Sequence, residues 1–211
     1  MADHLEIEQK YEADAGFALP PLDDLPGVAK VSAPERQRLD ATYFDTADLA
    51  LIRNKVTLRR RTGGADEGWH LKLPVRADVR QEVHEPLSSG AQVPARLRSQ
   101  VADLVGDQPL HPIANLLNER TVVRLSGPAD TVLAEIADDH VTARRLDAPG
   151  GDASAPLAWR EIEVEAGPGL EPSQAHDLLT ATGQRLRDAG ARPARSASKL
   201  ARLLDDPSPK Q

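Results

Sequence analysis

Cysteine is absent from this 211-residue chain, so neither disulfide bonds nor thiolate metal sites are open to it. Aromatic residues are scarce, with two each of Trp, Tyr and Phe, which argues against the stacking platforms of single-strand nucleic-acid binders. No apolar run approaches the roughly 18 residues of a membrane span, and the charged N-terminus lacks the apolar core of a secretory signal. These absences favour a cytoplasmic protein that binds neither membranes nor nucleic acid.

Charge is plentiful but unevenly spread along the chain. The net charge of −7 argues against a general nucleic-acid surface, because such a surface requires a basic face. Arginine nevertheless gathers at 59–61, at 120 and 124, and at 144–145. Such clusters suit a small anion held in an enclosed site, but most charge runs are solvated faces, so composition alone decides little.

Alternation with period two recurs in short segments and predicts strands whose two faces differ chemically. A charged face alternates with an apolar one in the segments 4–11, 56–61, 69–73, 120–125 and 161–165, and further strands are expected at 37–44, 79–87, 131–138 and 141–146. In a two-layer sandwich the charged faces would meet water, which is the simplest reading of any single strand. In a closed barrel they would line the interior, while the apolar faces pack outward against helices. Their recurrence along one chain favours the barrel.

Helices are expected at 95–105, 172–189 and 196–204. Pro172 suits a first helical position, Gly190 can end that helix, and Ser196 is the expected cap of the last one. The pair Gly150-Gly151 marks an exposed loop. The predicted fold is α+β, a closed antiparallel β-barrel of about eight strands with flanking helices. We expect one domain at residues 1–204, followed by a flexible tail at 205–211.

The segment Glu6-Ile7-Glu8-Gln9-Lys10 matches the E-x-E-x-K signature of the CYTH superfamily. From this point the chain resembles that family, the triphosphate tunnel metalloenzymes, along nearly its whole length. The other matching segments follow in the family's order: Tyr43–Thr46, Leu58–Arg61, Trp69–Pro74, Glu119–Thr121, Asp138, Glu161–Glu163 and Ser198–Leu200. The resemblance is closest to the CYTH domains that precede a CHAD domain in bacterial proteins. No CHAD segment follows within these 211 residues, so a stand-alone version and a fragment both stay open.

The resemblance implies roles for the charged residues, and the chemistry agrees, because guanidinium forks hold phosphate oxygens and carboxylates hold hard divalent cations. Phosphate contacts are implied for Lys10, Arg59, Arg61, Lys72, Arg120 and Lys199, and Arg124 joins them because it shares a strand face with Arg120. One or two Mg²⁺ or Mn²⁺ ions are implied at Glu6, Glu8, Asp138, Glu161 and Glu163. Catalytic roles are implied for Glu6, Glu8, Lys10, Glu161 and Glu163. Weaker candidates are Tyr43, His70, Arg80, Glu82 and Glu165.

Either Asp138 or its neighbour Asp139 could be the aspartate among the implied metal ligands. Asp138 is preferred on resemblance alone. Alternation does not support it, because it places Asp138 on the same strand face as the apolar Ile136.

The expected activity is metal-dependent hydrolysis of a triphosphate, with inorganic tripolyphosphate as the preferred substrate. Class IV adenylyl cyclase is one alternative and would have to seat an adenine; thiamine triphosphatase is another. A non-catalytic polyphosphate-binding module would be favoured if the carboxylates were lost while the arginines remained. Both sets are present, which favours an enzyme. The expected partner is a small-molecule triphosphate. Whether the chain also forms a homodimer is left open.

Overall fold

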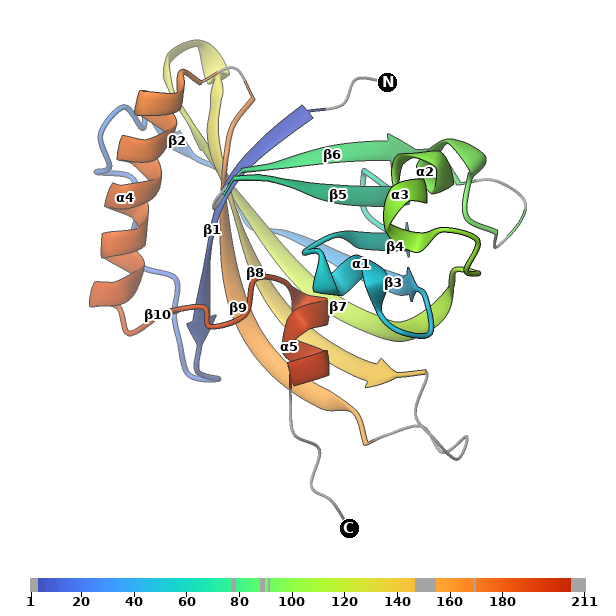
Figure 1. The fold of residues 1–211 in the computed structure, drawn as a ribbon. Helices are drawn as coiled ribbons and strands as arrows, with labels where there is room; N and C mark the ends of the chain where they lie inside the picture. The colour runs from blue at the N-terminus through green and yellow to red at the C-terminus, as the bar shows by residue number, and fades with distance from the viewer. Residues whose placement is uncertain are drawn as a thin grey trace.

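The computed structural model describes residues 4–76, 79–87, 90, 92–146, 155–168 and 170–205. Figure 1 shows how its helices and strands are arranged. In chain order they are β1 (His4–Ala13), β2 (Lys30–Val31), β3 (Glu35–Asp45), α1 (Ala50–Arg53), β4 (Thr57–Thr62), β5 (Gly68–Arg76), β6 (Val79–Glu85), α2 (Ala95–Gln100), α3 (Ala102–Val105), β7 (His111–Ser126), a 3₁₀ turn (Pro128–Asp130), β8 (Val132–Arg145), β9 (Leu157–Ala166), α4 (Pro172–Asp188), β10 (Arg192–Pro193) and α5 (Lys199–Asp205).

Within the described residues, eight strands close into an antiparallel barrel. Around the wall their order is β1-β6-β5-β4-β3-β7-β8-β9, and β9 pairs with β1 again. The seam depends on β1, because His4–Ile7 pair with β6 and Glu8–Ala13 pair with β9. The short β2 and β10 pair with β7 and β1 outside this circuit. The predicted closed barrel with flanking helices is confirmed.

Apolar side chains face outward over much of the wall and pack beneath helices. α4 lies along one side of the barrel (Figure 1), where its Leu179 packs with the outward-facing Ile162 and Val164. α1, α2 and α3 cover the opposite side, where Val101 packs with Trp69. Each strand therefore buries its apolar face outside the barrel and leaves its other face to the interior, as alternation requires.

One end of the barrel interior is apolar rather than charged. Leu200 and Leu203 of α5 pack against the inward-facing Val141 and Trp159. α5 thereby plugs this end, and its first residue, Lys199, is carried to the edge of the charged region. The expectation of a charged interior holds for only part of its length, because a short amphipathic helix needs an apolar surface to pack on.

Several predicted boundaries need correction. The helix expected at 95–105 is divided at Val101 into α2 and α3. The strands expected at 131–138 and 141–146 form one continuous strand, β8. Ser198 rather than Ser196 caps α5, since its hydroxyl accepts the backbone N–H of Ala201 at 3.1 Å. The loop at Gly150-Gly151 and residues 206–211 of the expected tail lie outside the described residues, and Asp205 ends α5. Among the described helices, none has the length and apolar character to cross a bilayer.

Gly183 provides a test of how closely α4 packs on β1. A Cβ atom added there would lie 1.9 Å from the Tyr11 hydroxyl oxygen. Gly183→Ala should therefore destabilise the protein by about 1–3 kcal/mol through overpacking, although alanine favours helix by up to about 1 kcal/mol. The free energy of unfolding in urea measures this.

Tyr11→Phe should recover part of that loss, because it removes the atom nearest the added methyl group. Gly16→Ala is the control, since its Cβ would meet nothing within 4 Å. A Gly183→Ala protein as stable as the parent would contradict the packing described for α4.

Candidate active site

Charged side chains meet inside the barrel because every strand sends alternate residues inward. They line a cavity of about 80 Å³. Its acids include Glu6 and Glu8 of β1, Glu82 of β6, and Glu163 and Glu165 of β9; its bases are Lys10, Arg59, Arg61, Lys72, Arg80, Arg120 and Lys199. Acids and bases from opposite walls thus share one enclosed space.

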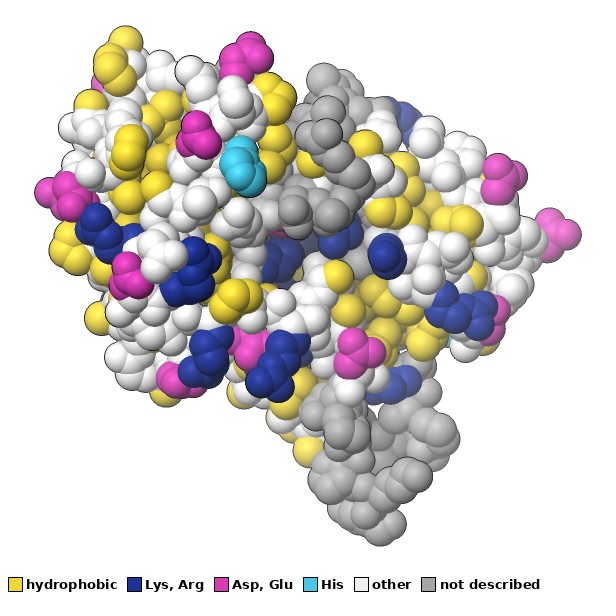
Figure 2. All heavy atoms as spheres, turned by 60° about the vertical axis from the view of Figure 1, so that its left-hand side comes forward, with side chains coloured by type: hydrophobic (Ala, Val, Ile, Leu, Met, Phe, Trp, Pro, Cys, Tyr) yellow, Lys and Arg dark blue, Asp and Glu magenta, His cyan; other side chains and the backbone are white. Residues whose placement is uncertain are grey.

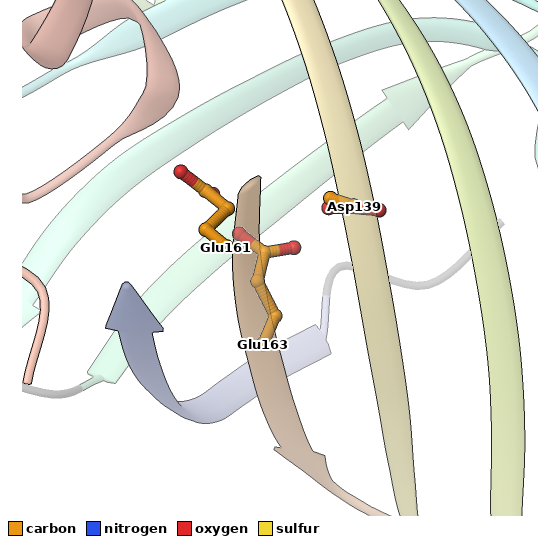
Figure 3. Close-up of side chains that lie close together, drawn as sticks. All are labelled: Asp139, Glu161 and Glu163. Atoms are coloured by element: carbon orange, nitrogen blue, oxygen red, sulfur yellow. The ribbon is translucent and has the colours of Figure 1, made fainter. Parts of the chain in front are cut away.

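Asp139, Glu161 and Glu163 form an acid triad, of which Glu163 lines this cavity. Figure 3 shows that the two glutamates come from β9 and Asp139 from the neighbouring β8. Their ligand oxygens lie within 4.8 Å of one another. The ammonium of Lys199 contacts all three, at 2.8 Å from Asp139, 2.6 Å from Glu161 and 2.9 Å from Glu163.

Further cations neutralise the acid triad. Arg120 donates two hydrogen bonds of 2.7 Å to Asp139 and one of 2.8 Å to Glu163, which Lys10 also contacts. Burial by itself would raise the pKa of both acids. Lys199 and Arg120 instead lower the pKa of Asp139 to about 2, and Lys10, Lys199 and Arg120 hold that of Glu163 well below its usual range. All three acids therefore sit in a strongly cationic setting.

The carboxylates nearer the other end of the cavity are unevenly compensated. Lys72 lies 2.5 Å from Glu6. Burial nevertheless raises the pKa of Glu6 to about 8, and a hydrogen bond with Glu82 adds to the shift. Burial, opposed by Lys72 and reinforced by neighbouring glutamates, raises the pKa of Glu165 to about 7. Burial would also raise the pKa of Glu82, but hydrogen bonds with His70 and Glu6 and the charges of Lys72 and Arg59 hold it well below its usual range.

Arg59 differs from the other interior cations in its partners. Its guanidinium donates to the Tyr43 hydroxyl at 3.4 Å, and among the described residues it forms no ion pair with a carboxylate. Arg61, next but one along β4, pairs with Asp66. The guanidinium N–H groups of Arg59 therefore face the cavity without an ion pair to a carboxylate among the described residues.

The structure brings most of the predicted site residues together. Glu6, Glu8, Lys10, Arg59, Arg61, Lys72, Arg120, Glu163 and Lys199 line the cavity. Glu161 lies behind these residues and is 4% exposed. Its carboxylate contacts the Lys199 ammonium and accepts a hydrogen bond from the Trp159 indole N–H. Arg124 lies at the barrel mouth, where it pairs with Glu35 at 2.9 Å and Glu135 at 3.1 Å.

The placement of Asp138 in this set is corrected to Asp139. Asp138 points outward and forms two hydrogen bonds with Arg160, of 2.9 and 2.7 Å. Arg160 in turn donates to the carbonyl oxygens of Asp14, Ala15 and Phe17, so this pair braces the segment after β1. The reason is strand parity: Asp138 shares the outer face of β8 with Ile136.

Other residues at the site were weak or absent in the sequence analysis. Arg80, Glu82 and Glu165 are signalled by alternation on β6 and β9, which places them beside stronger candidates. Asp66 had no such signal, because it lies in the turn between β4 and β5. His70 is buried and contacts Glu82 at 2.7 Å and the Asp66 carbonyl at 2.9 Å.

Neighbouring pockets connect the cavity to the surface. Glu8, Lys10 and Arg80 also line a pocket of about 500 Å³ beneath the 193–197 segment. At the other end Glu6 and Arg120 line one of about 370 Å³ that includes Arg124. Figure 2 shows basic side chains in and around a hollow on one face of the molecule. The cavity is thus open to a ligand from more than one side.

The CYTH domain profile matches residues 4–192, which includes every strand of this barrel. The chain belongs to the CYTH domain family. Its architecture is that of a triphosphate tunnel, and enzymes of this family use divalent metals. The closer resemblance to CHAD-linked CYTH domains stays a prediction.

Two proteins of Mycobacterium tuberculosis, from strains CDC 1551 / Oshkosh and H37Rv, are each 43% identical to this CYTH chain over 214 residues. Both are called uncharacterized proteins. The match covers 99% of this chain and 42% of each relative, so the chain spans about two fifths of their length.

Solved structures share the CYTH fold at lower identity. A Bacillus halodurans protein provisionally named an adenylate cyclase superposes with a TM-score of 0.65 at 21% identity, covering 96% of this chain and 99% of its own. A Pyrococcus horikoshii OT3 protein gives a TM-score of 0.54 at 14% identity, with 94% and 98% covered. At these identities the likeness concerns the fold.

Arg59 and Arg120 form a matched pair for testing the electrostatics of the cavity. Arg120→Met should lower the free energy of unfolding by about 3–5 kcal/mol, because it leaves Asp139 and Glu163 buried without that partner. Arg59→Met removes no carboxylate contact and should cost less than about 1 kcal/mol. Urea unfolding in phosphate-free buffer measures both. Equal losses in the two variants would contradict the assignment of Arg59 as the cation without an acid partner.

Proposed function

We propose that this CYTH domain is a metal-dependent triphosphatase that hydrolyses inorganic tripolyphosphate within the barrel. The observation that carries the proposal is Arg59, a guanidinium facing an enclosed cavity with no carboxylate partner among the described residues. A triphosphate carries about four negative charges at neutral pH, and guanidinium forks bond two phosphate oxygens at once. Tripolyphosphate itself is favoured by the resemblance that the sequence carries.

The cations around the cavity suit a chain of phosphates rather than a single anion. Arg59 and Arg61 project from one strand, while Lys10 and Lys72 project from others into the same space. Lys10 and Lys72 already contact carboxylates, at 2.8 Å from Glu8 and 2.5 Å from Glu6 respectively. We infer that these residues bind and orient the phosphate oxygens, and that Arg59 makes the first contact.

The acids of the cavity fit a hard divalent cation in their chemistry, since every ligand atom available is a carboxylate oxygen. We propose that Mg²⁺ or Mn²⁺ is held by Glu6, Glu8, Asp139, Glu161 and Glu163. When bound, the ion would neutralise charge on the transferring phosphoryl group and polarise it toward attack by water. Lys199 lies within the acid triad and would keep those carboxylates oriented.

The presence of both acids and bases supports an enzyme over a module that only binds polyphosphate. The acid triad is costly to bury and adds nothing to anion binding by itself. Its presence beside an anion cavity is explained if a cation has to act on the bound phosphates.

Asp138 and Asp139 are adjacent residues with opposite orientations and provide a matched test. Asp139→Asn should reduce metal-dependent phosphate release by at least about a hundredfold, because it removes an acid of the proposed metal set. Asp138→Asn should retain activity and lose about 1 kcal/mol of stability through its weakened bond to Arg160. Kinetics and urea unfolding measure the two effects.

Phosphate release from tripolyphosphate, assayed with Mg²⁺, with Mn²⁺ and with a chelator, tests the function itself. We expect hydrolysis that stops when the metal is removed, and loss of activity in Glu161→Gln or Glu163→Gln with folding retained. A parallel assay for cyclic AMP from ATP tests the cyclase alternative. Tripolyphosphate that binds but is never cleaved under any metal condition would favour the binding module instead.

A further inference from the structure

Asp66 differs from the other acids that line the charged cavity. Those acids project from barrel strands and have buried or half-buried side chains. Asp66 lies in the turn between β4 and β5, and its side chain is 62% exposed. Its carboxylate nevertheless pairs with the guanidinium of Arg61, which is only 4% exposed. A solvated acid therefore contacts a buried cation of the proposed phosphate site.

The backbone of this turn is held in place, while the carboxylate of Asp66 is open to solvent. His70 Nε2 lies 2.9 Å from the Asp66 carbonyl oxygen. His84 Nε2 lies 3.3 Å from the carbonyl oxygen of Glu67. A Cβ atom at Gly63 would lie 2.1 Å from a backbone carbonyl oxygen of β3, so the turn also packs closely against that strand. The Asp66 side chain can thus release its partner by rotating into water, without movement of the turn.

Arg61 has unused capacity to bind an anion. Its buried Nε–H group has no hydrogen-bond partner among the described residues. Burial and the neighbouring charges of Arg59 and Arg120 lower the pKa of Arg61 to about 10, and Asp66 opposes this shift only in part. Because the positive charge of this guanidinium is incompletely balanced, a phosphate group that carries more charge than one carboxylate would bind it more strongly.

Arg59 and Arg61 lie two residues apart on β4 and line the same cavity, roughly 7 Å apart along the strand at a rise of about 3.4 Å per residue. We propose that Asp66 is an internal competitor for the phosphate site, which occupies the Arg61 guanidinium and so sets how strongly the barrel prefers a chain of phosphates over orthophosphate. The proposal rests on the proposed function, because it requires phosphates to enter the barrel beside Arg59. A single phosphate held by Arg59 would leave the pair of Arg61 and Asp66 in place. A chain of three phosphates would reach both arginines and would have to displace the carboxylate.

Asp66→Asn tests the proposal, because it removes the competing charge and keeps a side chain of nearly the same size. Glu67→Gln is the matched control, since it makes the same change of charge at the next residue of the turn, which is exposed and does not line the cavity. Arg61→Met, alone and combined with Asp66→Asn, tests whether the effect depends on this guanidinium. Urea unfolding checks that each variant is folded.

Binding of tripolyphosphate and of orthophosphate is measured calorimetrically in EDTA, so that the readout does not depend on cleavage. We expect Asp66→Asn to lower the dissociation constant for tripolyphosphate by about tenfold, because the ligand no longer displaces a carboxylate, and to leave that for orthophosphate within about twofold. Glu67→Gln should change neither constant by more than about twofold. In the Arg61→Met background, Asp66→Asn should have no effect on either constant.

Carboxyl NMR of the parent chain gives a readout that requires no substitution. Burial by itself would raise the pKa of Asp66, but the charges of Arg61, His70 and Arg59 lower it. Tripolyphosphate should raise this pKa, because the carboxylate then loses Arg61 and gains an anionic neighbour. Orthophosphate should leave the pKa below its usual range.

The outcomes separate this inference from the proposed function. Tripolyphosphate that binds the parent chain but binds Asp66→Asn no more tightly would overturn the role of Asp66 and leave the proposed function intact. An equal gain in Glu67→Gln, or an equal gain for orthophosphate, would show an effect of net charge alone and would also overturn it. An Asp66 pKa that tripolyphosphate does not change would do the same. Failure of the parent chain to bind tripolyphosphate would overturn the proposed function and this inference together.

Discussion

Compensation of charge inside a closed wall is the constraint on which this structure depends. An ion taken out of water costs several kcal/mol unless its partners are close and well oriented. Asp139 has no exposed surface, yet it remains ionised because Arg120 and Lys199 both reach it. The barrel can therefore turn its charged faces inward only because acidic strands and basic strands stand opposite one another. Helices then cover the apolar faces that this arrangement leaves outside.

The acids and bases of the cavity do not compensate one another equally along its length, and this difference determines which ions each part can bind. At the acid triad, the cations Lys10, Arg120 and Lys199 lower the acid pKa values or contact the acids directly. Nearer the mouth burial raises the pKa of Glu6, while Arg59 forms no ion pair with a carboxylate among the described residues. One enclosed space thus offers guanidinium groups to an anion and carboxylates to a cation. A metal complex of a polyphosphate carries both kinds of partner in a single ligand.

Much of this could be predicted from the sequence, because period-two alternation is a local property. It located the barrel strands and most of the charged residues that face inward. On β8 it also placed Asp138 on the face of Ile136, which is the orientation that the structure has, whereas the metal ligand was chosen from the family resemblance. Alternation does not encode features that depend on the rest of the fold. These include the division of the expected helix at Val101, the continuity of β8 and the docking of α5 inside the barrel. The pocket between α1 and α5 is of this kind, because its walls are about 150 residues apart in the chain and meet only after the chain has folded.

β1 both closes the barrel and carries charged residues of the cavity. It forms the seam, pairing with β6 and β9, and it also carries Glu6, Glu8 and Lys10. Lys10 contacts Glu163 across 153 positions of chain, so β1, the first strand of this barrel to be synthesised, cannot complete its pairing until β9 has been synthesised. During that interval its unpaired edge is exposed to other chains. Pairing of β1 with β9 therefore completes the charged cavity and covers this edge of β1 in the same event.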